Sequence, residues 1–167
     1  MKNMTLATHE VAGGLVAAAV APLPAVGFIL AFLSHFALDA VPHWDYHISS
    51  LERNPADPLR DKVLFGRSFL GDAVKVVLDC LIGLAVILLF HYLAGLPLVP
   101  MLIGAVAGAL PDFLQFIYFV LKAEPITSLQ KFHVWMHATK KVRSAFGGIV
   151  FQAGVLAIIA FLVIYCR

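Results

Sequence analysis

Charged residues are scarce in this chain. Asp, Glu, Lys and Arg together make up 13% of its 167 residues, whereas 61% of the residues are hydrophobic. Soluble domains are about 25% charged, so the composition excludes an ordinary soluble protein. The formal net charge of +2 is also too small to argue for a nucleic-acid partner. We therefore predict a single integral membrane domain over residues 1–167, with membrane lipid as its immediate partner.

Cysteine is nearly absent. The chain has 2 cysteines, Cys80 and Cys166, and both lie within apolar runs. Neither has the spacing of a metal-binding cysteine pair, so we expect two free thiols and no disulfide. A cleavable signal peptide is not expected either. His9 and Glu10 interrupt the apolar region where one would lie, and the apolar run beyond them continues past a cleavable length.

Long apolar runs, punctuated by proline and glycine, predict membrane helices. The first run is too short to cross a hydrocarbon core of about 30 Å comfortably. Pro22 and Pro24 separate it from the second run, which ends at Pro42 because proline blocks continuation of a helix. The fold class is therefore predicted as all-α, a polytopic membrane bundle of about five helices. These helices are expected at about residues 5–21, 24–41, 68–93, 98–121 and 145–165.

Two polar segments separate the helices, at about residues 44–67 and 122–144. The first is expected to be a surface loop, with room for a short interfacial helix around 58–66. In the second, Pro125 begins an amphipathic helix predicted over about 126–142. Arg167 is expected on one side of the membrane, Lys75 within a span, and all the other Lys and Arg residues on the opposite side. The positive-inside rule therefore makes both polar segments cytoplasmic and the C-terminus external. The membrane expected is a prokaryotic inner membrane. The cations expected on the cytoplasmic side are Lys2, Arg53, Arg60, Lys62, Arg67, Lys122, Lys131, Lys140, Lys141 and Arg143.

Ionisable residues inside apolar helices are costly, and they are functional candidates for that reason. The sharpest group is His35, Asp39 and His43 at the end of the second apolar run. Residues i and i+4 share a helix face, so His35 and Asp39 can hold one ion together, and Asp39 and His43 nearly so. Imidazole nitrogen with carboxylate oxygen suits zinc first, with manganese or iron as alternative divalent metals.

An internal repeat would extend this site. His9-x3-Gly13 is followed by a helix, a proline turn and Pro42-His43, and Asp79-x3-Gly83 is followed in the same way by Pro111-Asp112. Two repeated helical hairpins plus a C-terminal transmembrane helix would place His9 and His43 opposite Asp79 and Asp112. Chance similarity between apolar segments is the alternative. Glycines near Asp112 would let neighbouring helices approach closely and turn its carboxylate away from lipid.

A late histidine pair, His133 and His137, lies on the amphipathic segment and can cover the site as a lid. The alternative is that at least one of the two is only a headgroup-level residue beside Trp135. Other structural roles compete as well: Asp79 can pair with Lys75, and a lone histidine can bond a carbonyl. The candidate general bases are Asp39 and Glu10. The candidate metal ligands are His9, His35, Asp39, His43, Asp79 and Asp112, with His137 next.

These motifs resemble the membrane-bound metal-dependent hydrolases, a predicted group linked distantly to the zinc-dependent phospholipase C fold. The resemblance is carried by Thr8-His9, by His35-x3-Asp39-x2-Pro-His43, by Ala-Leu-Pro111-Asp112 and by the late His-x3-His. It implies a bound divalent metal and a hydrolase that acts on phosphoesters. The His-Arg-Gly-x-Thr-His-Ser element of many such proteins is missing here, and His133 and His137 occupy the comparable late position.

Three classes of function fit this sequence. The first is a metallohydrolase, in which a metal-activated water attacks a phospholipid or another phosphoester. The second is a proton or metal-ion transporter, because intramembrane acids and broken helices are also transporter features. The third is a membrane assembly protein that uses a metal only for stability. We expect the first, an enzyme, because the polar residues gather near one face and do not continue to the other.

Overall fold

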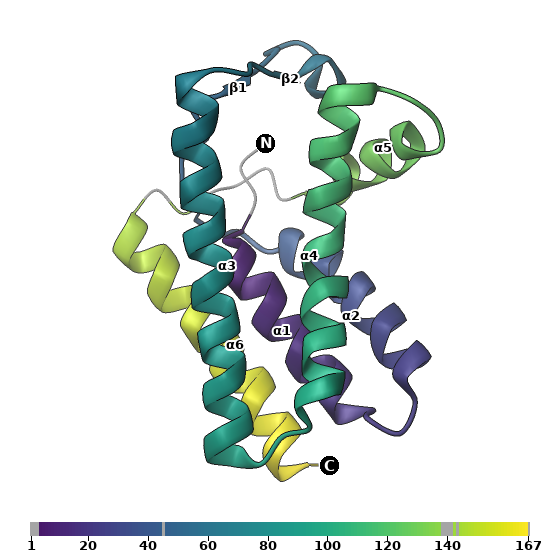
Figure 1. The fold of residues 1–167 in the computed structure, drawn as a ribbon, viewed down its shortest axis with the longest axis vertical. Helices are drawn as coiled ribbons and strands as arrows, with labels where there is room; N and C mark the ends of the chain where they lie inside the picture. The colour runs from purple at the N-terminus through teal and green to yellow at the C-terminus, as the bar shows by residue number, and fades with distance from the viewer. Residues whose placement is uncertain (1–3, 45, 138–141, 143, 167) are drawn as a thin grey trace.

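The computed structural model describes residues 4–44, 46–137, 142 and 144–166, which form six α-helices and one small β-sheet (Figure 1). The predicted all-α class is confirmed, but the count of about five helices is wrong by one. The sixth helix is the amphipathic one predicted after Pro125, which the count of the bundle left out and which packs on α2 and α4. The helices are α1 (Leu6–Ala19), α2 (Pro24–Asp39), α3 (Arg67–Ala94), α4 (Leu98–Leu121), α5 (Ile126–Met136) and α6 (Ala145–Tyr165).

Three of the helices, α3, α4 and α6, are long and apolar enough to cross a membrane. With 14 and 16 residues, α1 and α2 are apolar but shorter. At a rise of 1.5 Å per residue they reach only about 21–24 Å, less than a core of about 30 Å. In Figure 1, α1 lies between α3 and α4, and it packs on α2 and α6 as well. The short first helix is therefore the centre of the bundle.

Small residues allow α1 to press directly against α4. A methyl group added to Gly13 would collide with the backbone carbonyl of Gly104, and one added to Gly108 would collide with the carbonyl of His9. Glycine removes the Cβ that would otherwise hold two helix backbones apart. The predicted role of the α4 glycines in close packing is confirmed, and the contact brings His9 against α4.

The buried interior has an apolar half and a polar half. The apolar half lies towards the α3–α4 turn, and its buried side chains come from all four of the helices that meet there. The polar half lies around the C-terminal end of α2 and the first turns of α1. Buried residues of the apolar half are Val11, Leu15, Ala18, Ile87, Leu96, Met101, Ala105, Ala160 and Val163.

The loop between α2 and α3 is more structured than predicted. Strands β1 (Leu51–Glu52) and β2 (Lys62–Val63) pair antiparallel around a short 3₁₀ turn, Pro58–Arg60. The interfacial helix expected around 58–66 is only this turn, because the chain leaves it to pair with β1. The Asp72 carboxylate accepts a hydrogen bond from the Ser50 backbone N–H (2.7 Å) and ties the loop to α3.

Both polar segments lie at one end of the molecule. In Figure 1 the β1–β2 hairpin and α5 are at the same end, and the α3–α4 turn and the C-terminal end of α6 are at the other. The helix predicted over 126–142 ends at Met136. Residues 138–141 of that prediction lie outside the described part of the chain. The shared end agrees with the sequence prediction that the two segments belong to one side of a membrane.

Candidate metal centre

The centre of the polar half is the carboxylate of Asp39, which is completely buried in the last turn of α2. Four histidine Nε2 atoms surround its two oxygens. His133 Nε2 lies 2.7 Å from Asp39 Oδ2, with His35 Nε2 at 3.3 Å and His137 Nε2 at 3.7 Å from the same oxygen. His9 Nε2 lies 3.3 Å from Oδ1. A carboxylate enclosed in this way is unusual, because buried charges require compensating partners.

Separate parts of the chain supply these groups. His9 comes from α1, and His35 and Asp39 come from one face of α2 at the i, i+4 spacing. His133 lies in the last turn of α5, and His137 follows directly after that helix. The centre therefore forms only when α5 docks on α2 and α4, and it links the surface helix to the interior of the bundle.

His35 is oriented by a backbone group. Its Nδ1 lies 2.8 Å from the carbonyl oxygen of Gly108, so Nδ1–H donates there and Nε2 faces the centre. The same Nε2 lies 3.3 Å from His133 Nε2 and 3.8 Å from Asp112 Oδ1. Metal-bound histidines usually donate their second N–H to a carbonyl or carboxylate in this manner.

His43 repeats this arrangement at the edge of the centre. Its Nδ1 lies 2.7 Å from the carbonyl oxygen of Val41, which leaves Nε2 directed away from its own backbone. The His43 ring is beside that of His137, with 5.1 Å between the ring centroids. His43 is therefore a neighbour of the histidine cluster and extends it towards the loop end of the molecule.

Several buried polar atoms in the centre have no hydrogen-bond partner among the described residues. They are both ring nitrogens of His9 and Oδ1 of Asp39. His9 Nε2 and Asp39 Oδ1 lie 3.3 Å apart without good hydrogen-bond alignment. Leaving a buried polar atom poorly satisfied costs about 1–3 kcal/mol, so these atoms favour a further partner. A cation satisfies nitrogen and carboxylate oxygen lone pairs at once. The ring of His9 also stacks on that of His35, with 3.9 Å between centroids. The Nε2 atoms of the two rings both face Asp39.

Three sets of donors are close enough to bind a metal ion. In each set the ligand atoms lie within 4.8 Å of one another, and the sets share members, so they form one connected centre. Nitrogen and carboxylate donors in this mixture suit first-row divalent metals. These buried groups could therefore hold a metal ion. The sets are His9, His35 and Asp39; His35, Asp112 and His133; and Asp39, His133 and His137.

Two residues predicted for the site lie elsewhere. Asp79 Oδ2 accepts a hydrogen bond from the Leu6 backbone N–H (2.6 Å) at the first turn of α1, and Asp79 belongs to none of the three donor sets. A carboxylate there satisfies one of the free N–H groups at a helix start. Glu10 faces α3, where its carboxylate contacts Gly83. The structure thus brings together His9, His35, Asp39, Asp112 and His137, with His43 beside them.

The sequence prediction left out one central residue, His133, from its candidate ligands. Its Nε2 is the nearest of the four histidine nitrogens to Asp39. The i, i+4 spacing with His137 was visible, but the spacing alone does not say which member of the pair faces inward. Both face inward, because His133 is 1% and His137 8% exposed, whereas Trp135 between them is 75% exposed.

Gln152 supports the centre from α6. Its side-chain oxygen accepts hydrogen bonds from the hydroxyls of Thr5 and Thr8, each at 2.8 Å, and its amide donates to the Trp44 carbonyl at 2.7 Å. Thr8 precedes His9, so this network fixes the start of α1 against α6. The sequence had no signal for this role, because Gln152 lies alone in an apolar run.

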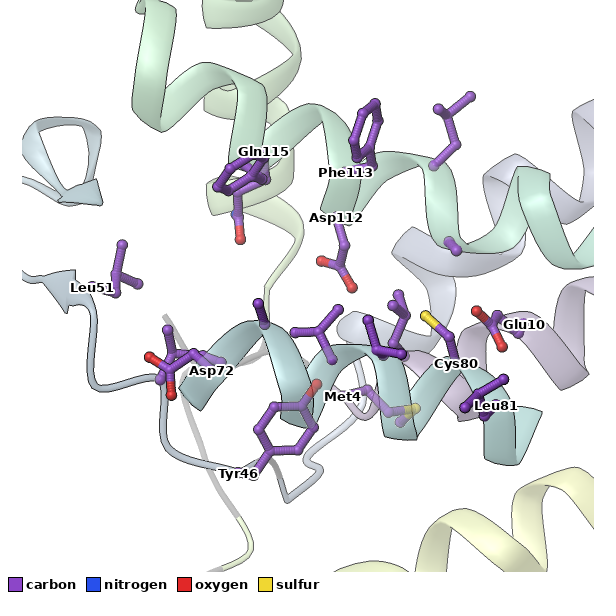
Figure 2. Close-up of a pocket in the computed structure, with 18 of the residues that line it drawn as sticks. Met4, Glu10, Tyr46, Leu51, Asp72, Cys80, Leu81, Asp112, Phe113 and Gln115 are labelled. Carbon is purple, nitrogen blue, oxygen red and sulfur yellow. The ribbon is translucent and has the colours of Figure 1, made fainter. Parts of the chain in front are cut away.

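A cavity of about 990 Å³ adjoins the centre, between α3 and α4. Most of the residues that line it are apolar, and Asp112 belongs to both the cavity wall and the donor sets. In Figure 2 the Asp112 carboxylate points from α4 into the space towards α3, and Glu10 approaches the same space from α1 beside Cys80. The cavity therefore gives the buried centre a connection to its surroundings.

No protein-family model, curated protein or solved structure matches this chain. The functional assignment consequently depends on the chemistry and geometry of the centre itself.

Proposed function

We propose that this protein is a membrane-embedded, metal-dependent hydrolase that cleaves a phosphoester or lipid substrate, with zinc as its metal. The observation that carries the proposal is the set of four histidines around the buried Asp39 carboxylate, with unsatisfied lone pairs on His9 and Asp39. A fully packed structural site has no need of an adjoining cavity. Here Asp112 lines a large one, so a substrate can reach the donors.

Each residue has a distinct part in this proposal. Asp39, His9, His35, His133, His137 and Asp112 would hold the metal in overlapping sets of three donors, and three protein ligands leave a position on zinc open for water. A divalent metal bound among them would supply Lewis-acid polarisation of the ester and activation of water. Gly108 holds the ring of His35 through its carbonyl. Glu10 lines the cavity, so of the two candidate bases it is the one placed to exchange a proton with a substrate there.

We place the centre near the cytoplasmic face. The β1–β2 hairpin and α5 share one end of the molecule, and the cations of the loops belong to these segments. Positive residues in short loops remain on the cytoplasmic side. A cysteine placed at position 56 or 128 should then be protected from an impermeant thiol reagent added outside intact cells. Strong labelling from outside would reverse the orientation.

A transporter is the alternative, and the interior argues against it. A transport path needs polar groups or water from one face to the other. Beyond the centre, the cluster of buried residues that the structure describes between α1, α3, α4 and α6 is apolar. A proton or metal flux through the protein in liposomes, dependent on Asp112, would nevertheless favour the transporter.

The proposal is tested by metal content and hydrolysis together. The protein purified in detergent should contain zinc or another divalent transition metal by elemental analysis, and it should cleave at least one member of a phosphoester and phospholipid panel. Replacing His133 with Ala should remove most of the metal and the activity. His47→Ala is the matched control, because His47 is an exposed loop histidine. Equal metal content in His133→Ala and wild type would contradict the proposed centre.

A further inference from the structure

The cavity between α3 and α4 is long as well as large. Its lining extends along α3 from Phe69 to Ile87 and along α4 from Leu102 to Phe119. At 1.5 Å per residue these walls are about 25 Å long, close to the thickness of a hydrocarbon core of about 30 Å. The cavity therefore runs along the two membrane-spanning helices, not across the bundle.

The walls of the cavity determine what can fill it. Nearly all the lining surface is apolar, so ordered water has few partners there. An empty space of about 990 Å³ would deprive its walls of dispersion contacts. Because α3 and α4 are candidate membrane spans, the medium around them is hydrocarbon. Val77, Val106 and Phe113 on the walls are 56%, 65% and 58% exposed, so the cavity is open along its side.

Charged side chains lie at three levels of the cavity wall, the third being Glu10 beside Cys80 and Leu81. Arg53 and Asp72 lie at the end near the β1–β2 hairpin, and Asp112 lies between this end and the apolar part of the cavity. From Asp112 the α4 wall continues for about 15 Å to Leu102 in the apolar direction. In the other direction it continues for about 10 Å to Phe119, past Gln115. The polar end, Asp112 and the long apolar wall match the headgroup, ester and chain of a bilayer lipid in order, and Glu10 is the one carboxylate among the described lining residues beside the chain portion.

We infer that this cavity binds one hydrocarbon chain of a membrane lipid, which enters sideways between α3 and α4. The chain lies along Leu81, Leu84 and Leu102, and the ester end lies at Asp112, where His35 Nε2 is 3.8 Å from the carboxylate. Arg53 at the rim matches an anionic headgroup in charge. If the protein is the proposed hydrolase, membrane lipid is its substrate class, and that part of the inference rests on the proposed function. Binding of the chain needs no catalysis and can be tested separately.

A matched pair of valines on α3 tests the site. Val77 lines the cavity, whereas Val74, one turn away, is equally exposed but does not line it. The probe is phosphatidylglycerol with a photoreactive diazirine on one acyl chain, placed in vesicles of phosphatidylethanolamine and phosphatidylglycerol. In the wild type, peptides of the α3 and α4 walls should be labelled, and unlabelled phosphatidylglycerol should compete. Val77→Trp should weaken this labelling about fivefold to tenfold, a change of roughly 1–1.4 kcal/mol, and Val74→Trp should leave it unchanged.

Failure of the inference can be distinguished from failure of the proposed function. Labelling that is not saturable, or equal in Val77→Trp and Val74→Trp, would overturn the lipid site even if the protein hydrolyses short-chain phosphoesters. Saturable wall labelling without hydrolysis by any metal-loaded protein would support the lipid site and overturn the hydrolase. If Val77→Trp does not fold, Ala109→Phe narrows the same cavity from α4 and gives the same comparison. Active protein should also prefer long-chain over short-chain esters, and Val77→Trp should remove that preference.

Discussion

Two consecutive residues of α1 lie in opposite environments. His9 is completely buried in the histidine cluster, whereas Glu10 lines the apolar cavity between α3 and α4. Neighbouring residues on a helix point about 100° apart, so a single central helix separates two regions. One is dense and polar, and the other is open and apolar. Asp112 is the described residue that belongs to both a donor set and the cavity wall.

This difference separates stability from substrate binding. In the histidine cluster, polar atoms depend on one another and on whatever satisfies the lone pairs of His9 and Asp39, so changes there should affect folding. In the cavity, the side chains of the walls line an open volume and are not packed against one another. Changes there should affect binding and turnover while the fold persists. Each of the predictions below tests one side of this division.

The largest effect is expected from Asp39→Ala. Removing this carboxylate takes away the partner of four histidines, and the loss of a buried ionic partner costs about 3–5 kcal/mol. Metal content should fall with it, because metal binding is linked to folding. Elemental analysis and thermal melting in detergent measure both. The matched control is Asp79→Ala, which removes an acceptor for N–H groups at the start of α1, among them that of Leu6, and should cost about 1 kcal/mol, the value of a helix cap, with the metal retained.

Comparing Asp39→Ala with Asp79→Ala also decides which of these two predicted ligands binds the metal. Full metal content in Asp39→Ala would show that the centre is wrongly assigned. Loss of metal in Asp79→Ala, with the fold intact, would instead restore Asp79 as a ligand and favour the repeated-hairpin interpretation.

A smaller effect is expected from Gly13→Ala. The added methyl group would collide with the Gly104 carbonyl and force α1 away from α4, which carries His9 away from the cluster. Overpacking of this kind costs about 1–3 kcal/mol, and the melting temperature and zinc affinity should fall together. Gly154→Ala on α6 is the control, since nothing lies within 4 Å of a methyl group there. If both variants melt alike, the close contact between α1 and α4 does not limit stability.

How far the sequence could predict this molecule depends on whether a feature is local. The helices follow from apolar runs and proline, and the His35 and Asp39 pair follows from i, i+4 spacing within α2. Asp79 and Asp112 both lie within apolar helices, so nothing local indicates that only Asp112 joins the histidines. The position of His133 depends on how α5 docks, which is a tertiary property. The cavity also depends on tertiary packing, because it forms where the side chains of α3 and α4 do not meet.

The smallest effect on stability is expected from Glu10→Gln, on the cavity side of α1. Glutamine keeps the size of the side chain and much of its hydrogen bonding. The free energy of unfolding should therefore change by only about 0.5 kcal/mol, as for substitutions that break no buried network, and the melting temperature should stay close to that of the wild type. Metal content should equal that of the wild type, because Glu10 is absent from the donor sets of the described residues. Turnover should nevertheless fall by about 10²–10⁴, the usual contribution of a general acid or base. Steady-state hydrolysis of the best substrate, measured beside zinc content, separates these quantities. Unchanged turnover would remove Glu10 from the chemistry and leave Asp112 as the carboxylate that joins the two regions, whereas loss of zinc would show that the two sides of α1 are not independent.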